Sequence, residues 1–297
     1  MKPDIVQITV LPEGRAEVII RYWLTGLLIC VIGLTIVQQF DKRDAHYTDQ
    51  VAVLMYHHLH EEDTSSSTIK PELFRQQLAY LQSKGHHFIT LDQFKKFLGG
   101  AEVPDNAVLV TFDDGYESFY TMGVPILKEL QIPAVNFIIT ETLDHPQEDT
   151  PPKMSREQIT AMTTGSDLID AECHTHAFHG KREDGKAYLV QEADETDQQY
   201  IDRMLADTRT CKANVEQADP HQVDTMAYPF GISDKNTALA VQAAGIHYGF
   251  TIQPLMATRG VDPYRIPRIN AGAPQVSPEG LEAIIAQKIV AVRKTSR

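Results

Sequence analysis

The segment Ala-Val-Leu-Val-Thr-Phe-Asp-Asp-Gly at positions 107–115 indicates both the fold of this chain and the place of its chemistry. Its first half is short and apolar, which predicts a buried strand, and Gly115 supplies a tight turn after it. Asp113 and Asp114 therefore leave the carboxyl end of a buried strand, where α/β barrels carry their catalytic residues. Asp-Asp-Gly is also ordinary turn chemistry, so a surface turn is the alternative for the motif taken alone.

The rest of the chain alternates between predicted strands and predicted helices. Strands are predicted at 51–56, 87–90, 107–112, 134–139, 168–173, 225–228, 248–252 and 265–269. Helices are predicted at 71–84, 91–98, 119–130 with an interruption near Pro125, after a Ser155/Gln158 capping pair, and at 196–217, 235–244 and 278–292. Strands that alternate with helices predict an α/β fold with a parallel sheet.

Three histidines crowd six residues behind the strand predicted at 168–173, at positions 174, 176 and 179. His174 and His179 are five positions apart, which does not fit one face of a helix. The spacing fits a strand end followed by a loop that curls back. Two imidazoles and one carboxylate from the aspartate pair would form an open metal site with room for water and substrate.

These motifs together resemble the polysaccharide deacetylases, carbohydrate esterase family 4. The first motif of that family is Thr-Phe-Asp-Asp-Gly, which is complete here. The second motif usually has two histidines four positions apart, whereas here Phe178 stands at that place and His179 follows it. The longer spacing is similar to the branch that deacetylates poly-β-1,6-N-acetylglucosamine, the exopolysaccharide of biofilms.

Three further segments resemble the same branch, and the resemblance runs from about residue 50 to the end of the chain. Val-Leu-Met-Tyr-His-His at 53–58 is similar to its N-terminal strand, and Arg-Ile-Pro-Arg at 265–268 is similar to a late element. Ala-Tyr-Pro-Phe-Gly at 227–231 is similar to the third family motif, but Ala227 stands where that motif usually has arginine.

The resemblance implies a distorted (β/α)₇ barrel that hydrolyses N-acetyl groups of an N-acetylglucosamine polymer, with the site at the carboxyl ends of the strands. It also implies a divalent metal ion, with Zn²⁺ favoured over Co²⁺ or Ni²⁺. The implied roles are metal ligation by Asp114, His174 and His179, proton abstraction by Asp113, protonation of the leaving nitrogen by His57, oxyanion binding by the backbone N–H of Phe230, and orientation of Asp113 by Arg265 or Arg268.

Several of these roles have alternatives. His58 could be the acid in place of His57, although neighbours along a strand point to opposite faces. His176 could replace His179 as a ligand, in a His-x-His pair similar to that of the metal-dependent amidohydrolases. The substrate could be chitin or peptidoglycan, which carry the same acetamide. A non-catalytic surface protein that binds glycan is the alternative from another functional class.

The 297 residues suffice for one large catalytic domain at 51–297, and their formal net charge of −13 argues against a nucleic-acid partner. The densest acidic run, at 192–197, is interpreted as a solvated loop or the start of a helix. The cysteines at positions 173 and 211 could form a disulfide outside the cytoplasm.

The N-terminal part of the chain predicts attachment to a membrane. Positions 22–40 hold nineteen residues without a charge, close to the length that crosses a bilayer. No Ala-x-Ala-like site follows, which favours an uncleaved signal anchor over a cleaved signal peptide. The expected order is a tail at 1–21, a single span at 22–40 and a tether at 41–50. The family resemblance places the catalytic domain outside the cytoplasm, where the machinery that makes and exports the polymer could be a partner.

Overall fold

The computed structural model describes residues 46–291, apart from residues 64, 166 and 220. These residues belong to one compact unit that spans Ala45–Arg297. The predicted tail, the predicted membrane span at 22–40 and the first half of the predicted tether lie outside the described residues. Within the described part of the chain, no helix is both long enough and apolar enough to cross a membrane.

The centre of the unit is a sheet of parallel strands, as the alternation of strands and helices predicts. Its main strands lie side by side in the order β1 (Gln50–Tyr56), β5 (Ala107–Phe112), β6 (Ala134–Ile138), β7 (Ile169–Cys173), β8 (Thr225–Ala227) and β9 (Tyr248–Phe250). Because all of these pairings are parallel, the carboxyl ends of the strands meet at one edge of the sheet.

Shorter strands complete the sheet. β4 (His87–Phe88) pairs with β5, while β10 (Ala257–Thr258) and β11 (Ile269–Asn270) both pair with β1. A separate small sheet is formed by β2 (His58–Leu59) and β3 (Thr68–Ile69).

The sheet curls, and the chain between β9 and β11 links its two ends. Phe250 of β9 is bridged to Ile266, and Leu54 of β1 is in register with Ile269. The strand predicted at 265–269 is therefore reduced to a bridge and a short strand, since Pro267 between them has no N–H to donate. The α/β class is confirmed. In place of a regular barrel, the structure has a curled parallel sheet whose two ends are joined by the Phe250–Ile266 bridge and by β11.

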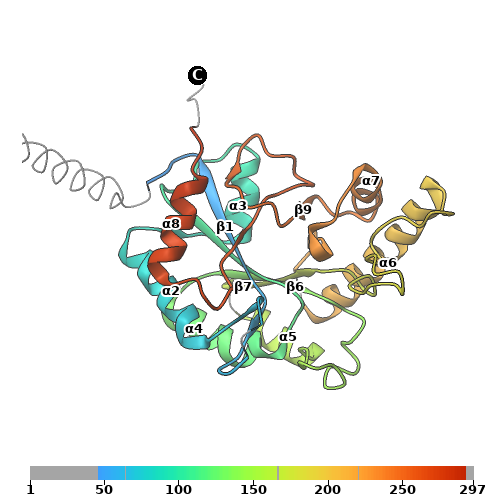
Figure 1. Cartoon of the computed structure of the whole chain (residues 1–297), viewed down its shortest axis with the longest axis horizontal. Helices are drawn as coiled ribbons and strands as arrows, with labels where there is room; N and C mark the ends of the chain where they lie inside the picture. The colour runs from blue at the N-terminus through green and yellow to red at the C-terminus, as the bar shows by residue number, and fades with distance from the viewer. Residues whose placement is uncertain (1–45, 64, 166, 220, 292–297) are drawn as a thin grey trace, which may run out of the picture. The chain divides into compact units, whose positions relative to one another are not determined.

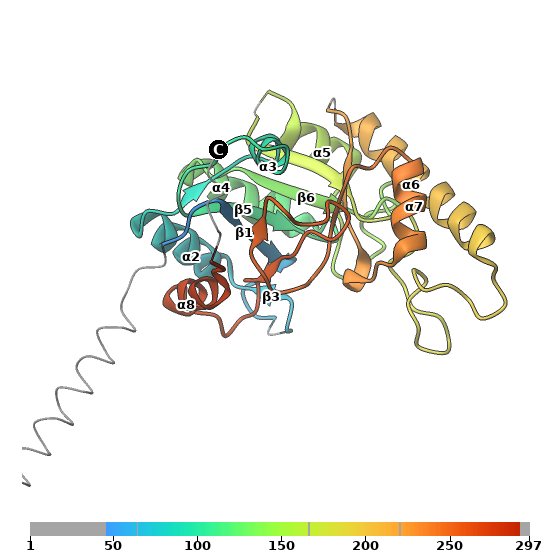
Figure 2. The ribbon, with the colours of Figure 1, turned by 90° about the horizontal axis from the view of Figure 1, so that it is seen from above.

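Helices lie round the outside of the curved sheet (Figure 1). They are α2 (Pro71–Ser83), α4 (Val124–Leu130), α5 (Arg156–Thr163), α6 (Asp197–Ala218), α7 (Lys235–Ala243) and α8 (Pro278–Lys288). α3 (Leu91–Leu98) instead packs Phe94 and Phe97 into the same apolar cluster as Val51 and Val53 of β1. Two pairs of helices lie side by side (Figures 1 and 2). α2 packs against α8 from the other end of the described chain, and α6 packs against α7, the next helix along.

Local signals set the ends of several helices. α5 begins at the predicted capping pair, in which the Ser155 hydroxyl accepts from the backbone of Gln158 and the Gln158 side chain accepts from the backbone of Ser155. The helix predicted at 119–130 is a π-helical turn, Phe119–Gly123, followed by α4. Pro125 lies at the start of α4 and cannot donate a backbone hydrogen bond to the preceding turn, which explains the predicted interruption.

Alternation along the strands divides the core into an outer and an inner layer. On β1, Ala52 and Leu54 belong to the outer cluster beneath the helices, whereas Val51 and Val53 belong to the inner cluster. Continued along β5 from the inner residue Leu109, the same period places Thr111 and Asp113 on the inner side. Strand geometry thus delivers a carboxylate to the inside of the sheet at its carboxyl edge.

The cysteines at positions 173 and 211 are both buried and both free, so the disulfide considered from the sequence is absent from the described residues. Cys211 Sγ instead lies 3.7 Å from the backbone oxygen of Ile138. Both cysteines belong to the outer layer of the core and act there as small apolar residues.

Candidate active site

The turn after β5 has an unusual backbone conformation. Asp114 has a φ of 73° and Gly115 a φ of 67°, and few residues other than glycine adopt positive φ. A Cβ on Gly115 would lie 3.2 Å from Cγ2 of Ile138 at the end of β6, so the turn packs closely against the neighbouring strand. Strained backbone of this kind concentrates at functional sites, and here it directs the Asp114 side chain away from the strand.

Asp114, His174 and His179 converge on one point. Asp114 Oδ1 lies 3.3 Å from His174 Nε2 and 3.0 Å from His179 Nε2. One ligand atom from each of the three residues lies within 4.8 Å of the other two. His174 and Asp114 are buried, while the His179 side chain is 28% exposed, so the cluster is open on one side. The structure therefore brings together the three residues that the sequence predicts as metal ligands.

The hydrogen bonding of this cluster fits a metal ion. His174 Nδ1 lies 2.8 Å from the backbone oxygen of Ala227, and because a carbonyl only accepts, Nδ1 carries the proton. With the proton on Nδ1, a neutral His174 would present the lone pair of Nε2 to Asp114 Oδ1, which is buried and, among the described residues, has no partner with the geometry of a hydrogen bond. A cation between two such acceptors removes their repulsion, and a histidine fixed through its other nitrogen is typical of metal ligands.

Asp113 forms a two-point ion pair with Arg268. The distances are 2.6 Å from Nη1 to Oδ1 and 2.7 Å from Nη2 to Oδ2, and both side chains are buried. The guanidinium is itself held by the backbone oxygen of Thr251 at 2.9 Å and the hydroxyl of Thr111 at 3.3 Å. Such bidentate pairs fix a carboxylate in both position and orientation.

The charge on Asp113 follows from the same contacts. Burial opposes its ionisation, but Arg268, together with the nearby His174 and His57, outweighs burial and lowers the pKa of Asp113 below its ordinary value. Asp113 is therefore ionised at neutral pH. A buried, ionised and rigidly held carboxylate beside a metal site has the properties of a general base.

His57 stands directly after β1 and faces Asp113, with 3.9 Å between His57 Nε2 and Asp113 Oδ2. Its Nδ1 is buried and has no hydrogen-bond partner in the described structure. Burial lowers the pKa of His57, whereas the charges of Asp113 and Asp114 act in the opposite direction. His58 points elsewhere, as strand alternation predicts, and its Nδ1 lies 2.8 Å from the hydroxyl of Ser118.

The other residues predicted from the sequence differ in how close they lie to the Asp114, His174 and His179 cluster. The His176 Nδ1 lies 3.0 Å from the hydroxyl of Thr140, outside the group formed by the three ligands. Phe230 has a φ of 58° and stacks on the ring of His179 with 5.2 Å between the ring centroids. Arg265 is exposed at the surface, so only Arg268 of the two predicted arginines meets Asp113.

Tyr116 and Lys153 also lie at the site and have no counterpart among the sequence predictions. The Lys153 ammonium is buried 3.6 Å from the centre of the Tyr116 ring. The pKa of Tyr116 is raised by burial and by the nearby Asp114 carboxylate. Tyr116 directly follows the aspartate motif, and this position in the sequence was a signal that it lies at the site. Lys153 follows a proline-rich loop and reaches Tyr116 through a β-bridge, for which no local sequence signal exists.

A comparison with protein families agrees with this geometry. Residues 100–249 match the family model described as polysaccharide deacetylase. The chain belongs to the polysaccharide deacetylase family. It is therefore an enzyme, a hydrolase that acts on the amide of N-acetyl groups, and the alternative of a glycan-binding protein without activity is set aside. The family acts on polysaccharides, which agrees with the expected N-acetylglucosamine polymer.

Similar proteins belong to the branch that the sequence motifs resemble. The poly-β-1,6-N-acetyl-D-glucosamine N-deacetylase of Staphylococcus epidermidis is 27% identical over 227 residues, which are 76% of this chain and 74% of that protein. The protein of the same name from Staphylococcus aureus strain MSSA476 is 27% identical over 209 residues, 70% of this chain and 69% of its own length.

Solved structures show the same fold. IcaB from Ammonifex degensii is 27% identical, with a TM-score of 0.68 over 80% of this chain and 97% of that protein. A de-N-acetylase from Aggregatibacter actinomycetemcomitans is 20% identical, with a TM-score of 0.70 over 80% of this chain and 100% of that one. The second likeness supports the fold alone.

Proposed function

We propose that this enzyme removes N-acetyl groups from poly-β-1,6-N-acetyl-D-glucosamine with the help of a bound divalent metal ion. The observation that carries the proposal is the cluster of Asp114, His174 and His179 beside the Asp113–Arg268 pair. The acetamide is the same in chitin and peptidoglycan, so the catalytic residues alone do not select the polymer. Support for the β-1,6-linked polymer comes from the five-position histidine spacing and from the relatives named for that substrate.

Asp114, His174 and His179 would hold the metal ion. Two imidazoles and one carboxylate leave positions for water and for a substrate oxygen, and this set favours Zn²⁺, with Co²⁺ and Ni²⁺ as alternatives. When bound, the ion would lower the pKa of its water and polarise the N-acetyl carbonyl.

The other residues would move the protons. Asp113 would accept a proton from the attacking water as the water oxygen bonds to the acetyl carbon, and the backbone N–H of Phe230 would donate to the carbonyl oxygen as it gains charge. His57, in its protonated form, would deliver a proton to the nitrogen as the C–N bond breaks, which releases acetate and leaves a free amine. Because Arg268 favours the ionised form of Asp113, the carboxylate would hold its proton weakly and return readily to its starting state.

The setting of the reaction is also proposed from the sequence. The apolar stretch at 22–40 would anchor the chain in the cell membrane by one span, with the catalytic domain outside the cytoplasm. A polymer that emerges from its synthase and export machinery would meet the enzyme there. Partial deacetylation would create cationic sites on the polymer, which would promote adhesion to anionic surfaces during biofilm formation.

The substrate is tested with N-acetylglucosamine oligomers of equal length that differ only in linkage. We expect acetate release to be faster from β-1,6-linked than from β-1,4-linked oligomers, to stop with a chelator, and to return when Zn²⁺ is added. Faster release from β-1,4-linked oligomers would assign the enzyme to chitin or peptidoglycan. Release that is insensitive to thorough chelation would contradict the metal site.

The location is tested by fractionation of cells that express the whole chain. We expect the activity to sediment with membranes and to become soluble when the chain is shortened to begin near residue 46. Activity of the whole chain in the soluble fraction would contradict the anchor.

A further inference from the structure

His179 is the ligand with the least support from regular structure. His174 follows β7 directly, whereas His179 lies in the connection to α6, and the chain leaves the strand through Thr175 with a φ of 73°. His179 is also the more exposed of the two histidines. A metal ligand on a loop is useful only if other contacts fix the loop, because a site must be held close to its productive geometry.

Asp207 of α6 fixes the start of this loop. Its carboxylate accepts the backbone N–H of His176 at 2.9 Å and that of Ala177 at 2.7 Å, one with each oxygen. The Asp207 side chain is buried, so these two hydrogen bonds are shielded from water. The backbone immediately before His179 is thereby tied to a long helix.

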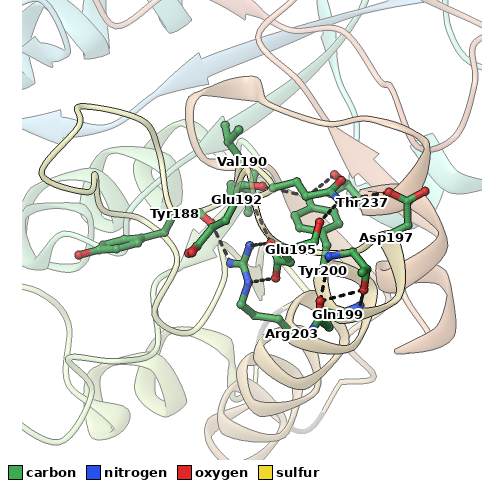
Figure 3. A network of polar contacts seen from close by, with 12 residues as sticks. Tyr188, Val190, Glu192, Glu195, Asp197, Gln199, Tyr200, Arg203 and Thr237 are labelled. Carbon is green, nitrogen blue, oxygen red and sulfur yellow. Dashed lines mark hydrogen bonds and ion pairs between the residues drawn. The ribbon is translucent and has the colours of Figure 1, made fainter.

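Arg203 lies one turn before Asp207 on the same face of α6 and fixes the rest of the loop. Its guanidinium pairs with both oxygens of Glu195, with 2.7 Å from Nε to Oε1 and 2.8 Å from Nη2 to Oε2 (Figure 3). Nη1 donates to the backbone oxygen of Tyr188 at 2.9 Å. The guanidinium carbon also lies 4.9 Å from the centre of the Phe178 ring.

The contact with Phe178 links this network to the metal site. Phe178 directly precedes His179 and packs partly into the outer core, so a cation held over its ring also restrains the neighbouring ligand. Phe178 is the residue that lengthens the spacing between the histidines to five positions. Phe178 is half-buried with the Arg203 guanidinium over its ring, and His179 directly after it lies 3.0 Å from Asp114 Oδ1.

The far end of the loop is anchored as well. The Tyr200 hydroxyl contacts the backbone oxygen of Leu189 at 2.8 Å and the hydroxyl of Thr237 on α7 at 2.7 Å (Figure 3). Glu195 belongs to the acidic run that the sequence predicts as a solvated loop or helix start, yet its side chain is only 11% exposed. The run does contain the start of α6, but Glu195 is a structural partner of Arg203 and is not a solvated charge.

We propose that Arg203 and Asp207 are positioning residues that hold the loop at 175–195 so that His179 completes the metal site. The inference rests on the metal site proposed above. It predicts that changes at these two positions weaken metal binding although neither side chain touches the metal ligands' imidazole or carboxylate groups. Outer partners of metal ligands commonly contribute roughly 10–100-fold to metal affinity.

The test measures the Kd of the whole chain for Co²⁺ and Zn²⁺. The absorption of bound Co²⁺ reports on ligand geometry, and a chromophoric chelator serves as the competitor. We expect Arg203→Met and Asp207→Asn each to weaken the Kd by about tenfold and to alter the Co²⁺ spectrum. Arg203→Lys should retain part of the affinity, since it keeps the charge but loses the two-point pair. Arg209→Met, on the exposed face of the same helix, is the matched control and should bind as the wild type does.

Glu195→Gln keeps the test decisive if Arg203→Met does not fold. Glu195→Gln should also weaken metal binding. The double variant Arg203→Lys/Glu195→Gln should lose less affinity than the sum of the two single losses, because both substitutions disrupt the same Arg203–Glu195 ion pair. An unchanged Kd and Co²⁺ spectrum in the variants, even with a lower Tm, would overturn the positioning role. A wild-type chain that binds neither ion would instead overturn the metal site itself, so the two failures are distinct.

Discussion

Arg268 meets the carboxylate of Asp113 through two hydrogen bonds although 155 positions separate the two residues in the chain. Ala227 stands where the third family motif usually has arginine, and Asp113 here meets Arg268 of the late Arg-Ile-Pro-Arg element. The backbone of Ala227 still serves the site, because its oxygen fixes the tautomer of His174. The cation beside Asp113 therefore comes from the late Arg-Ile-Pro-Arg element and not from the third motif.

Removal of either histidine of the loop distinguishes the metal ligand from its neighbour. We expect His179→Ala to lose divalent-ion retention and activity, because one of three ligands is gone. His176→Ala should keep most of both, since His176 contacts Thr140 outside the metal cluster. Metal analysis and acetate release of the two purified variants provide the measurement. The reverse order would show that the ligands are His174 and His176.

Asp113→Asn tests the general base. The amide cannot accept the proton of the water, so we expect the rate of acetate release to fall by roughly two to four orders of magnitude. Metal content should stay near that of the wild type, because Asp113 lies outside the triad of ligands. A variant that lost its metal together with its activity would place Asp113 among the ligands.

The acid is tested by a pair of variants at adjacent positions. His57→Ala should reduce kcat by roughly two to four orders of magnitude, since His57 faces Asp113 and would deliver the second proton. His58→Ala should reduce kcat much less, because the His58 ring contacts the hydroxyl of Ser118 and not Asp113. Steady-state kinetics with one oligomer compares them directly, and equal losses would leave His57 without a special role.

The pair of Arg268 and Asp113 predicts a shift in the pH dependence of kcat/KM. Arg268 lowers the pKa of Asp113, so its loss should raise that pKa and move the acidic limb of the profile to higher pH. Arg268→Lys should move the limb less than Arg268→Met, because a single ammonium retains the charge without the two-point contact. An acidic limb at the same or a lower pH in both variants would contradict this assignment.

The same pair makes a contribution to stability with a defined sign. Because the folded-state pKa of Asp113 is depressed, the contribution is present above the unfolded pKa and is lost as the pH falls through the folded pKa. The difference in stability between the wild type and the Arg268 variants should therefore be smaller in acid than at neutral pH. The Tm of the metal-free wild type and of each Arg268 variant, measured from neutral to acidic pH, gives the loss of stability at each pH.

The sequence by itself determined the features that depend on neighbours within a few positions. The buried strand before Asp113, the turn at Gly115 and the capping pair of Ser155 with Gln158 all follow from local residue types and spacing. Strand alternation, which is likewise local, placed His57 and His58 on opposite faces, and the family resemblance favoured His57. The histidine spacing indicated a strand and a loop because a helix could not accommodate it.

Tertiary structure alone decided which distant residues meet. Arg268, and not the exposed Arg265, reaches Asp113, and the backbone oxygen of Thr251 holds its guanidinium. Lys153 reaches Tyr116 only because a long loop returns to the motif. The pairing of Arg203 with Glu195 likewise depends on how the loop folds back onto α6. Arg268 and Asp113, like Lys153 and Tyr116, are far apart along the chain, whereas Arg203 and Glu195 are only eight positions apart. In each case the contact is set by burial and packing, which composition and periodicity do not encode at single positions.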